Sequence, residues 1–274
     1  MSDYIRTASR IAREAAAIIE DLRRQKIGFE LKGEADLVTQ ADRQSEIHIT
    51  RELLRAYPEH AIVAEEGNNS HSESGYRWFV DPVDGTTNFA HGFPVYNITM
   101  ALERYGELIA GIIYDPTRDE MFAAEKSAGA YLNGERISVS RAARLEDALW
   151  ATGFPSRKRH QNINIHFYYQ LAMISHGVRR AGSAAIDLAY VACGRLDGFW
   201  EFGLNPWDMA AGKLMVEEAG GAITDMHGAP HHLITSRHLL ATNAHVHEAT
   251  LALFGDIFAD RSPFRIPEVS VYKG

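Results

Sequence analysis

Apolar residues recur at helical spacing along the first part of the chain. Between residues 2 and 24 they occupy Ile5, Ala8, Ile11, Ala12, Ala15, Ile18, Ile19 and Leu22. Because a helix brings residues three and four positions apart onto one face, this pattern predicts an amphipathic helix from about Ser2 or Asp3 to Arg24. A second helix is predicted from about Ala41 or Asp42 to Tyr57, since Pro58 cannot continue it.

The middle of the chain has the shorter apolar runs that are typical of strands. A buried strand is predicted at residues 61–64 and another at 76–80. The second is expected to end before Pro82, which cannot donate a ladder hydrogen bond. Further strands are predicted at residues 97–102, 108–114, 120–124 and 131–139. Asn133-Gly134 indicates a hairpin turn in the last of them.

Helices and strands alternate in the second half. Helices are predicted at residues 163–176, 184–193, 209–219 and 246–258, and strands at 197–202 and 239–242. Glycines close three of these helices, at Gly177, Gly194 and Gly220. The pattern predicts an α/β half that follows the β-rich middle. The last segment, Arg261–Gly274, contains two prolines and is expected to be an extended arm or a disordered end.

Candidate chemistry is concentrated after the strand at 76–80, in Asp81-Pro82-Val83-Asp84-Gly85-Thr86-Thr87. Two carboxylates this close repel each other unless a cation or a proton lies between them. With no lysine or arginine in the segment, they are suited to a hard cation, Mg²⁺ first. The alternative is an ordinary strand-to-helix turn, in which Asp81 and Asp84 are turn residues and Thr86 or Thr87 caps a helix.

Composition narrows the class of protein. The chain has 274 residues, 46% of them hydrophobic, and a net charge of −8, which argues against a nucleic-acid-binding surface. Its single cysteine, Cys193, excludes an intrachain disulfide and fits a reducing cytoplasm. No apolar run approaches the roughly 20 residues of a membrane span, and the N-terminus lacks an apolar signal core.

Three motifs together resemble the inositol monophosphatase family: Glu65-Glu66, the stretch from Asp81 to Phe89, and the stretch from Asn205 to Gly212. The resemblance extends to Asp36–Thr39 with Asp42, to Gly153-Phe154-Pro155 and to Gly182–Ala185. It implies the layered α/β/α/β/α sandwich of the inositol monophosphatase and fructose-1,6-bisphosphatase type. A single catalytic domain is expected over residues 1–260, with an α+β half to about 145, an α/β half after it, and a tail at 261–274.

The resemblance also implies roles for individual residues. The implied ligands of two or three Mg²⁺ ions are Glu65, Asp81, the backbone carbonyl of Val83, Asp84 and Asp208. The implied catalytic pair, which orients and deprotonates the attacking water, is Asp42 and Thr86. The implied substrate contacts are Gly85, Thr86, Gly182, Ser183, Ala184, Glu201 and Asp208.

The activity implied by the resemblance is Mg²⁺-dependent hydrolysis of inositol 1-phosphate, without a covalent intermediate. A homodimer sensitive to lithium, with no direct nucleic-acid or membrane partner, is expected. Related members act on fructose 1,6-bisphosphate, NADP, histidinol phosphate or adenosine bisphosphates, and these substrates stay open. A role as an accessory factor in transcription or RNA processing is the alternative from a different class.

Overall fold

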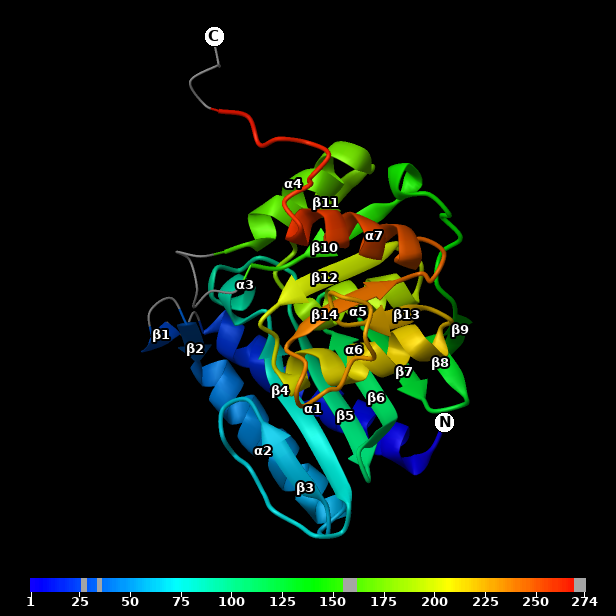
Figure 1. Cartoon of the computed structure of the whole chain (residues 1–274). Helices are drawn as coiled ribbons and strands as arrows, with labels where there is room; N and C mark the ends of the chain where they lie inside the picture. The colour runs from blue at the N-terminus through cyan, green and yellow to red at the C-terminus, as the bar shows by residue number, and fades with distance from the viewer. Residues whose placement is uncertain (26–28, 34–35, 155–161, 269–274) are drawn as a thin grey trace.

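The computed structural model describes residues 1–25, 29–33, 36–154 and 162–268, with only the backbone described at 29–33 and 36–38. Five layers follow one another, three of helices and two of sheet (Figure 1). Helices α1 and α2 cover one face of a seven-stranded sheet, α5 and α6 lie between that sheet and a five-stranded one, and α4 and α7 cover the outer face. The predicted α/β/α/β/α sandwich is confirmed.

The first layer has the helices that the apolar spacing predicts. Helix α1 runs from Asp3 to Arg24, and the Ser2 hydroxyl accepts a hydrogen bond from the Ile5 N–H at 3.4 Å. Helix α2 runs from Gln40 to Ala56 and begins with a capping box between Thr39 and Asp42. Their apolar faces pack on the large sheet, which explains why both patterns were legible in the sequence.

The seven-stranded sheet has the order β3-β4-β5-β6-β7-β8-β9, and only β3 and β4 are parallel to each other. Its strands are β3 (Ala61–Ala64), β4 (Tyr76–Asp84), β5 (Asn97–Arg104), β6 (Glu107–Asp115), β7 (Glu120–Glu125), β8 (Gly129–Leu132) and β9 (Glu135–Ile137). The predicted hairpin turn is confirmed, because Asn133 and Gly134 both have positive φ, 49° and 86°.

One strand prediction was wrong. Strand β4 does not end before Pro82 but continues to Asp84. Its register against β5 shifts between Asp81, which pairs with Thr99, and Asp84, which pairs with Asn97. The extra residue makes a bulge, and a bulge leaves one position without a ladder partner, so a proline is tolerated there. The bulge also redirects the strand end that carries Asp81 and Asp84.

The five-stranded sheet has the order β11-β10-β12-β14-β13. Its strands are β10 (Leu149–Thr152), β11 (Gly177–Arg179), β12 (Gly198–Phe202), β13 (Ala222–Thr224) and β14 (His238–Thr242). The helices of this half are α4 (Asn164–Ile174), α5 (Ala184–Ala192), α6 (Pro206–Glu218) and α7 (His247–Phe258). The predicted helices of this half are confirmed to within a few residues at their ends.

Several short elements were not predicted as such: β1 (Phe29–Gly33), β2 (Asp36–Thr39), α3 (Thr86–Ala90), η1 (Leu145–Asp147), β10, β11 and β13. With three to five residues each, they contain too little sequence for a period to be recognised. The predicted capping role of Thr86 was also wrong. The N-cap of α3 is Gly85, with φ of 94°, and Thr86 is the first helical residue.

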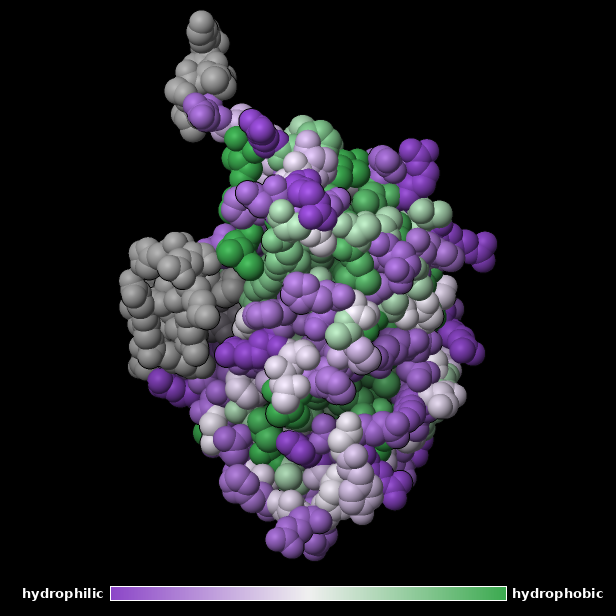
Figure 2. All heavy atoms as spheres, in the orientation of Figure 1, coloured by the Kyte–Doolittle hydropathy of each residue, from purple (hydrophilic) through white to green (hydrophobic). Residues whose placement is uncertain are grey.

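The tail leaves the sandwich at the outer layer. The Gln170 side chain on α4 accepts a hydrogen bond from the Phe264 N–H at 2.9 Å and donates one to the Phe264 carbonyl oxygen at 2.6 Å. The start of the tail is therefore an extended arm fixed to α4. Apolar residues gather at the surface around α4, α7 and this arm (Figure 2), among them Ile165, Met173 and Phe258.

Candidate active site

The predicted site residues come from separate elements that meet between the two halves of the sandwich. Asp81 and Asp84 lie at the end of β4, and the Glu65 N–H donates to the Val80 carbonyl oxygen at 3.2 Å, which holds the turn after β3 beside it. Asp42 lies in the first turn of α2 and Asp208 in the first turn of α6. Carboxylates near helix N-termini are stabilised by the helix dipole, so both positions suit an anion.

Asp81 is at the centre of the carboxylate group. It is 2% exposed, and its Oδ1 accepts a hydrogen bond from the Val83 N–H at 2.9 Å. Burial raises its pKa well above the usual range, and the charges of Glu65, Asp84 and Asp208 raise it further. Three carboxylates from separate parts of the chain therefore act electrostatically on Asp81.

Asp84 is held by donors from both halves of the molecule. Its Oδ2 accepts hydrogen bonds from Ser183 Oγ at 2.6 Å, from Asn97 Nδ2 at 2.9 Å and from the Ala185 N–H at 2.9 Å. Burial raises the pKa of Asp84, and these hydrogen bonds oppose that rise because they favour the charged form. One carboxylate oxygen is thus fully occupied by protein donors.

Asp208 and Glu201 contribute carboxylates from the second half. Asp208 Oδ2 accepts a hydrogen bond from the Asn205 N–H at 2.7 Å, which completes the capping box of α6. Burial raises the pKa of Asp208 to about 8, and the charges of Asp84 and Glu201 add to the rise. Burial, with Asp84, likewise raises the pKa of Glu201 to about 8, while Arg180 acts in the opposite direction.

Thr86 and Asp42 are joined directly. The Thr86 hydroxyl lies 2.9 Å from Asp42 Oδ1 and 3.0 Å from the Val83 carbonyl oxygen. Asp42 is 0% exposed, and its other oxygen accepts from Thr39 N at 2.7 Å and Thr39 Oγ1 at 2.5 Å. Burial raises the pKa of Asp42. Asp42 therefore caps its helix with one oxygen and holds Thr86 with the other.

The donor set suits a hard divalent cation. Carboxylate oxygens and a backbone carbonyl are the ligands that Mg²⁺ prefers, and positive charge would remove the repulsion that raises the pKa of Asp81. Within the described residues, however, no three His, Cys, Asp or Glu side chains form a ready-made metal centre. The chemistry of the donors fits Mg²⁺, and the assignment of individual ligands stays a prediction.

The segment predicted to contact substrate borders this group. Gly182 has φ of 86°, and Ala184 begins α5. Asn88 Nδ2 donates to the carbonyl oxygens of Val95 at 2.7 Å and Ala181 at 2.8 Å, which fixes the segment to the end of the first motif. The Ser183 hydroxyl caps α5 by accepting from the Ile186 N–H at 3.3 Å.

Gly153 explains part of the Gly153-Phe154-Pro155 motif, of which Pro155 is outside the described residues. A Cβ on Gly153 would lie 2.0 Å from Glu201 Oε2. Because real Cβ atoms do not approach an oxygen so closely, only glycine leaves room for the Glu201 carboxylate in this position.

Three further polar residues were not predicted from the sequence. Asp187 on α5 is 2% exposed, and burial, Glu201 and Asp84 raise its pKa well above the usual range. Glu46 on α2 accepts hydrogen bonds from the Glu66 and Asn68 N–H groups, and Asn97 binds Asp84. The available signal was polarity where apolar residues are expected: an acid within an apolar helix, and an amide at the start of an apolar strand.

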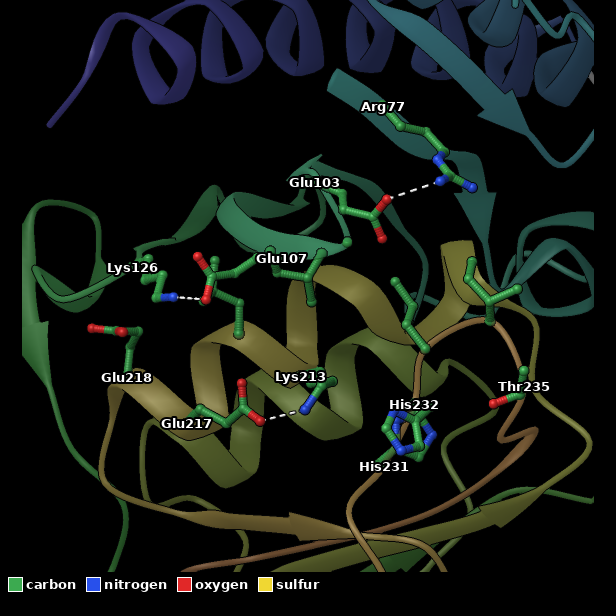
Figure 3. A pocket seen from close by; sticks show the side chains of 15 residues that line it. Arg77, Glu103, Glu107, Lys126, Lys213, Glu217, Glu218, His231, His232 and Thr235 are labelled. Carbon is green, nitrogen blue, oxygen red and sulfur yellow. Dashed lines mark hydrogen bonds and ion pairs between the residues drawn. The ribbon is translucent and has the colours of Figure 1, made fainter. Parts of the chain in front are cut away.

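A groove with charged lining residues lies away from these carboxylates. It measures about 510 Å³ and lies beside the second half of α6, against the turn between β5 and β6 (Figure 3). Three ion pairs join charged side chains of its lining: Arg77 with Glu103 at 3.0 Å, Lys126 with Glu107, and Lys213 with Glu217. None of its lining residues belongs to the predicted site, so this groove carries no part of the chemistry above.

Comparisons with known proteins agree with the motifs. Residues 1–258 match the model of the inositol monophosphatase family. An inositol-1-monophosphatase of Mesorhizobium japonicum is 47% identical over 207 residues, which are 74% of this chain and 77% of that protein. The Nus factor SuhB of Pseudomonas aeruginosa is 42% identical over 259 residues, which are 92% of this chain and 95% of that protein.

A solved structure gives the same result in three dimensions. The extragenic suppressor protein SuhB of Bartonella henselae is 41% identical, covers 92% of this chain with 98% of its own, and superimposes with a TM-score of 0.88. None of the helices in the described part of the chain is both long and apolar enough to span a membrane.

Proposed function

Because the chain belongs to the inositol monophosphatase family, we propose that it is a Mg²⁺-dependent phosphatase that hydrolyses inositol 1-phosphate to inositol and phosphate. The observation that carries the proposal is the electrostatic effect of Glu65, Asp84 and Asp208 on the buried Asp81, although the turn after β3, the end of β4 and α6 supply these carboxylates separately. Such a group of anions is costly to bury without positive charge, which suits a site that is complete only with metal.

The metal ligands in this proposal are Glu65, Asp81, the Val83 carbonyl, Asp84 and Asp208, which would hold two or three Mg²⁺ ions. When bound, Mg²⁺ lowers the pKa of water and neutralises charge on a phosphoryl group. Asp84 Oδ1 is the oxygen that this proposal assigns to metal, because three protein donors contact Oδ2.

Thr86 and Asp42 would act on the attacking water. The Thr86 hydroxyl has one proton, and donation to Asp42 Oδ1 leaves its lone pairs to accept a hydrogen bond from water. Asp42, with a pKa raised by burial, is suited to take up the proton that the water loses. Water attacks the phosphorus atom, the bond from phosphorus to the inositol oxygen breaks, and the alkoxide leaving group takes a proton from solvent or a bound water.

The substrate hydroxyls would lie against the second half of the molecule. Glu201 accepts or shares hydrogen bonds with ring hydroxyls, and Gly85, Thr86 and the segment Gly182–Ala184 line the phosphate and ring. The Ser183 hydroxyl is committed to Asp84 and to the cap of α5. Ser183 therefore acts on substrate through its backbone rather than its side chain.

We also propose the finer properties that family membership supports. These are inhibition by lithium, a homodimer, a cytoplasmic location, and a single catalytic domain over residues 1–260 with two halves. Exposed apolar residues on α4 and at the end of α7 are consistent with a protein interface in this layer.

A substrate panel tests the function. Phosphate release is measured with inositol 1-phosphate, fructose 1,6-bisphosphate, histidinol phosphate and NADP, each with Mg²⁺. The proposal expects inositol 1-phosphate to have the highest kcat/KM. Much faster cleavage of another member of the panel would contradict the proposed substrate and support the proposed phosphatase activity. If none of the compounds is cleaved, both the substrate and the activity are contradicted.

A second function is favoured by a specific observation, the 42% identity over 95% of a protein named as a Nus factor. This function is an accessory role in transcription through a protein partner. It predicts that a strain with Asp208→Asn, whose product lacks phosphatase activity, still complements a deletion of the gene. Loss of complementation by this variant would attribute the phenotype to catalysis.

A further inference from the structure

Asn97 is a buried amide that contacts the carboxylate group from the first residue of β5. It is 0% exposed. Its Nδ2 donates to Asp84 Oδ2 at 2.9 Å and to Ser183 Oγ at 2.8 Å. One side-chain nitrogen from the first half of the molecule therefore contacts both the Asp84 carboxylate and the Ser183 hydroxyl of the candidate active site.

The orientation of this amide is fixed by Asp84. Its oxygen, Oδ1, has no hydrogen-bond partner among the described residues. Turning the amide over would place Oδ1 against the carboxylate oxygen of Asp84, and two acceptors repel each other. This orientation leaves the Asn97 Oδ1 unpaired, which costs stability, and it directs the amide nitrogen at Asp84 and Ser183. A buried amide in this state indicates that its donated hydrogen bonds are what the position requires.

Ser183 completes the contact between the halves. Its hydroxyl donates to Asp84 at 2.6 Å while it accepts from Asn97. With the Ala185 N–H, three donors meet on one oxygen of Asp84, one from β5 and two from the start of α5. These hydrogen bonds fix the carboxylate plane of Asp84 relative to both halves. They therefore also fix the direction in which Oδ1 points.

We infer that Asn97 is a positioning residue, which acts through Asp84 and Ser183 to hold the second oxygen of Asp84 toward the Mg²⁺ site. This inference rests on the proposed function. Asn97 touches neither metal nor substrate. Asn97 restricts the rotation of the Asp84 side chain before metal binds, so that less conformational freedom is lost on binding. It also couples the start of α5, which is proposed to line the substrate site, to the metal ligand.

Mg²⁺ binding by the metal-free protein gives a readout that does not depend on turnover. Thermal unfolding of wild type and of Asn97→Leu is followed while MgCl₂ is titrated, and the midpoint of the stabilisation is recorded. We expect the midpoint of Asn97→Leu to rise about tenfold, the lower end of losses seen when partners of metal ligands are removed. Its phosphatase activity should recover in part as MgCl₂ is raised.

Asn243→Leu is the matched control. Asn243 is also 0% exposed, and its Nδ2 also makes two bonds, to Ser140 Oγ and the Ala142 carbonyl oxygen at 2.8 Å each. It is expected to lower thermal stability and to leave the Mg²⁺ midpoint unchanged. Asn97→Ala is measured as well, since it removes the donor without adding bulk.

The outcomes separate this inference from the proposed function. If wild type shows no response to Mg²⁺, the proposed function fails. If wild type responds and the Asn97 variants have the same midpoint as wild type, or shift it no more than Asn243→Leu, only the positioning role fails. Failure of both Asn97 variants to fold would also overturn it, because Asn97 would then serve the fold and not the ligand.

Discussion

The Thr86 hydroxyl lies 2.9 Å from Asp42 Oδ1, and this contact joins the first turn of α3 to the first turn of α2. Each residue has a further contact besides this one, because Asp42 also binds Thr39 and Thr86 also lies 3.0 Å from the Val83 carbonyl oxygen. Asp42 uses its other oxygen to cap α2, and Thr86 does not cap α3, whose N-cap is Gly85. In the proposed mechanism, this contact orients the Thr86 hydroxyl so that it can accept a hydrogen bond from the attacking water.

Thr86→Ala should reduce kcat by about 100-fold, because the water loses its hydrogen-bond acceptor and its link to Asp42. The protein should still fold, because Thr86 is a partly exposed first-turn residue, although the buried Asp42 loses one hydrogen bond. Thr87→Ala is the control, because Thr87 is exposed and follows directly in the same helix. Steady-state kinetics with inositol 1-phosphate measure the effect, and near-normal turnover of Thr86→Ala would refute the role.

Glu46→Ala should weaken both stability and Mg²⁺ binding. The Glu46 carboxylate accepts from Glu66 N at 2.7 Å, from Asn68 N at 2.9 Å and from Asn68 Nδ2 at 2.8 Å, so it holds the turn that follows Glu65. Removing it breaks three part-buried hydrogen bonds to a charged acceptor, at a cost of about 1.5–3 kcal/mol in the free energy of unfolding.

Gln44→Ala, at an exposed position on the same helix, is the control for Glu46→Ala. Chemical denaturation and the Mg²⁺ midpoint are measured for both variants. An unchanged Mg²⁺ midpoint in a destabilised Glu46→Ala would limit Glu46 to a role in folding.

Gly85→Ala should destabilise the protein more than replacement of a glycine at positive φ usually does. Gly85 has φ of 94°, and a Cβ there would lie 2.8 Å from the Val95 carbonyl oxygen. The conformational cost alone is about 1 kcal/mol, and the collision adds to it. In Gly106→Ala, with φ of 83° and no atom within 4 Å of the added Cβ, only the conformational cost applies. Equal losses in the two variants, measured by denaturation, would show that the chain at Val95 yields freely.

Folding stability should depend on His60 below neutral pH. His60 stacks between Tyr57 and Tyr76, with ring centroids 4.9 Å and 4.5 Å away, and its Nδ1 accepts from Trp78 Nε1 at 3.0 Å. Burial lowers its pKa below the usual 6.5. At a pH between the two pKa values, His60 is therefore protonated in the unfolded chain and neutral in the folded chain. The stability is fully present above about pH 6.5 and is lost as the pH falls toward the lower pKa of the folded state.

Comparison with His60→Phe isolates this contribution from the other titrating groups. The free energy of unfolding is measured between about pH 8 and about pH 5 for both proteins. Wild type should lose more stability than His60→Phe as the pH falls. Parallel pH profiles would show that His60 does not titrate on unfolding.

The long helices and strands could be predicted from the sequence because they bury regular faces, whereas their arrangement in layers was implied by the family resemblance. The spacing from Ile5 to Leu22 and the apolar run of β4 each reflect one such face, and both were legible without other information. The extent of β4 could not be predicted from the sequence, because a proline normally ends a strand. Only the pairing with β5 shows that Pro82 lies in a bulge.

The candidate site was predictable where a residue belongs to a motif and not where it acts through another residue. Asp81, Asp84 and Asp208 were predicted as site residues because they belong to motifs that resemble those of the inositol monophosphatase family. Asn97 was missed, because its importance comes from the distance to Asp84 and Ser183, and no local pattern records that distance. Ser183 was predicted to contact substrate, but its hydroxyl donates to Asp84, which the sequence does not reveal.

The most direct test of the central claim is the dependence of phosphate release on Mg²⁺. Protein freed of metal with chelator is supplied with inositol 1-phosphate, and release is measured as MgCl₂ is added, for wild type and for Asp208→Asn. The account predicts no release without metal, a saturable rise with Mg²⁺ in wild type, and a loss of that rise in Asp208→Asn. Equal release by wild type in chelator and in Mg²⁺, or no release at any Mg²⁺ concentration, would contradict it.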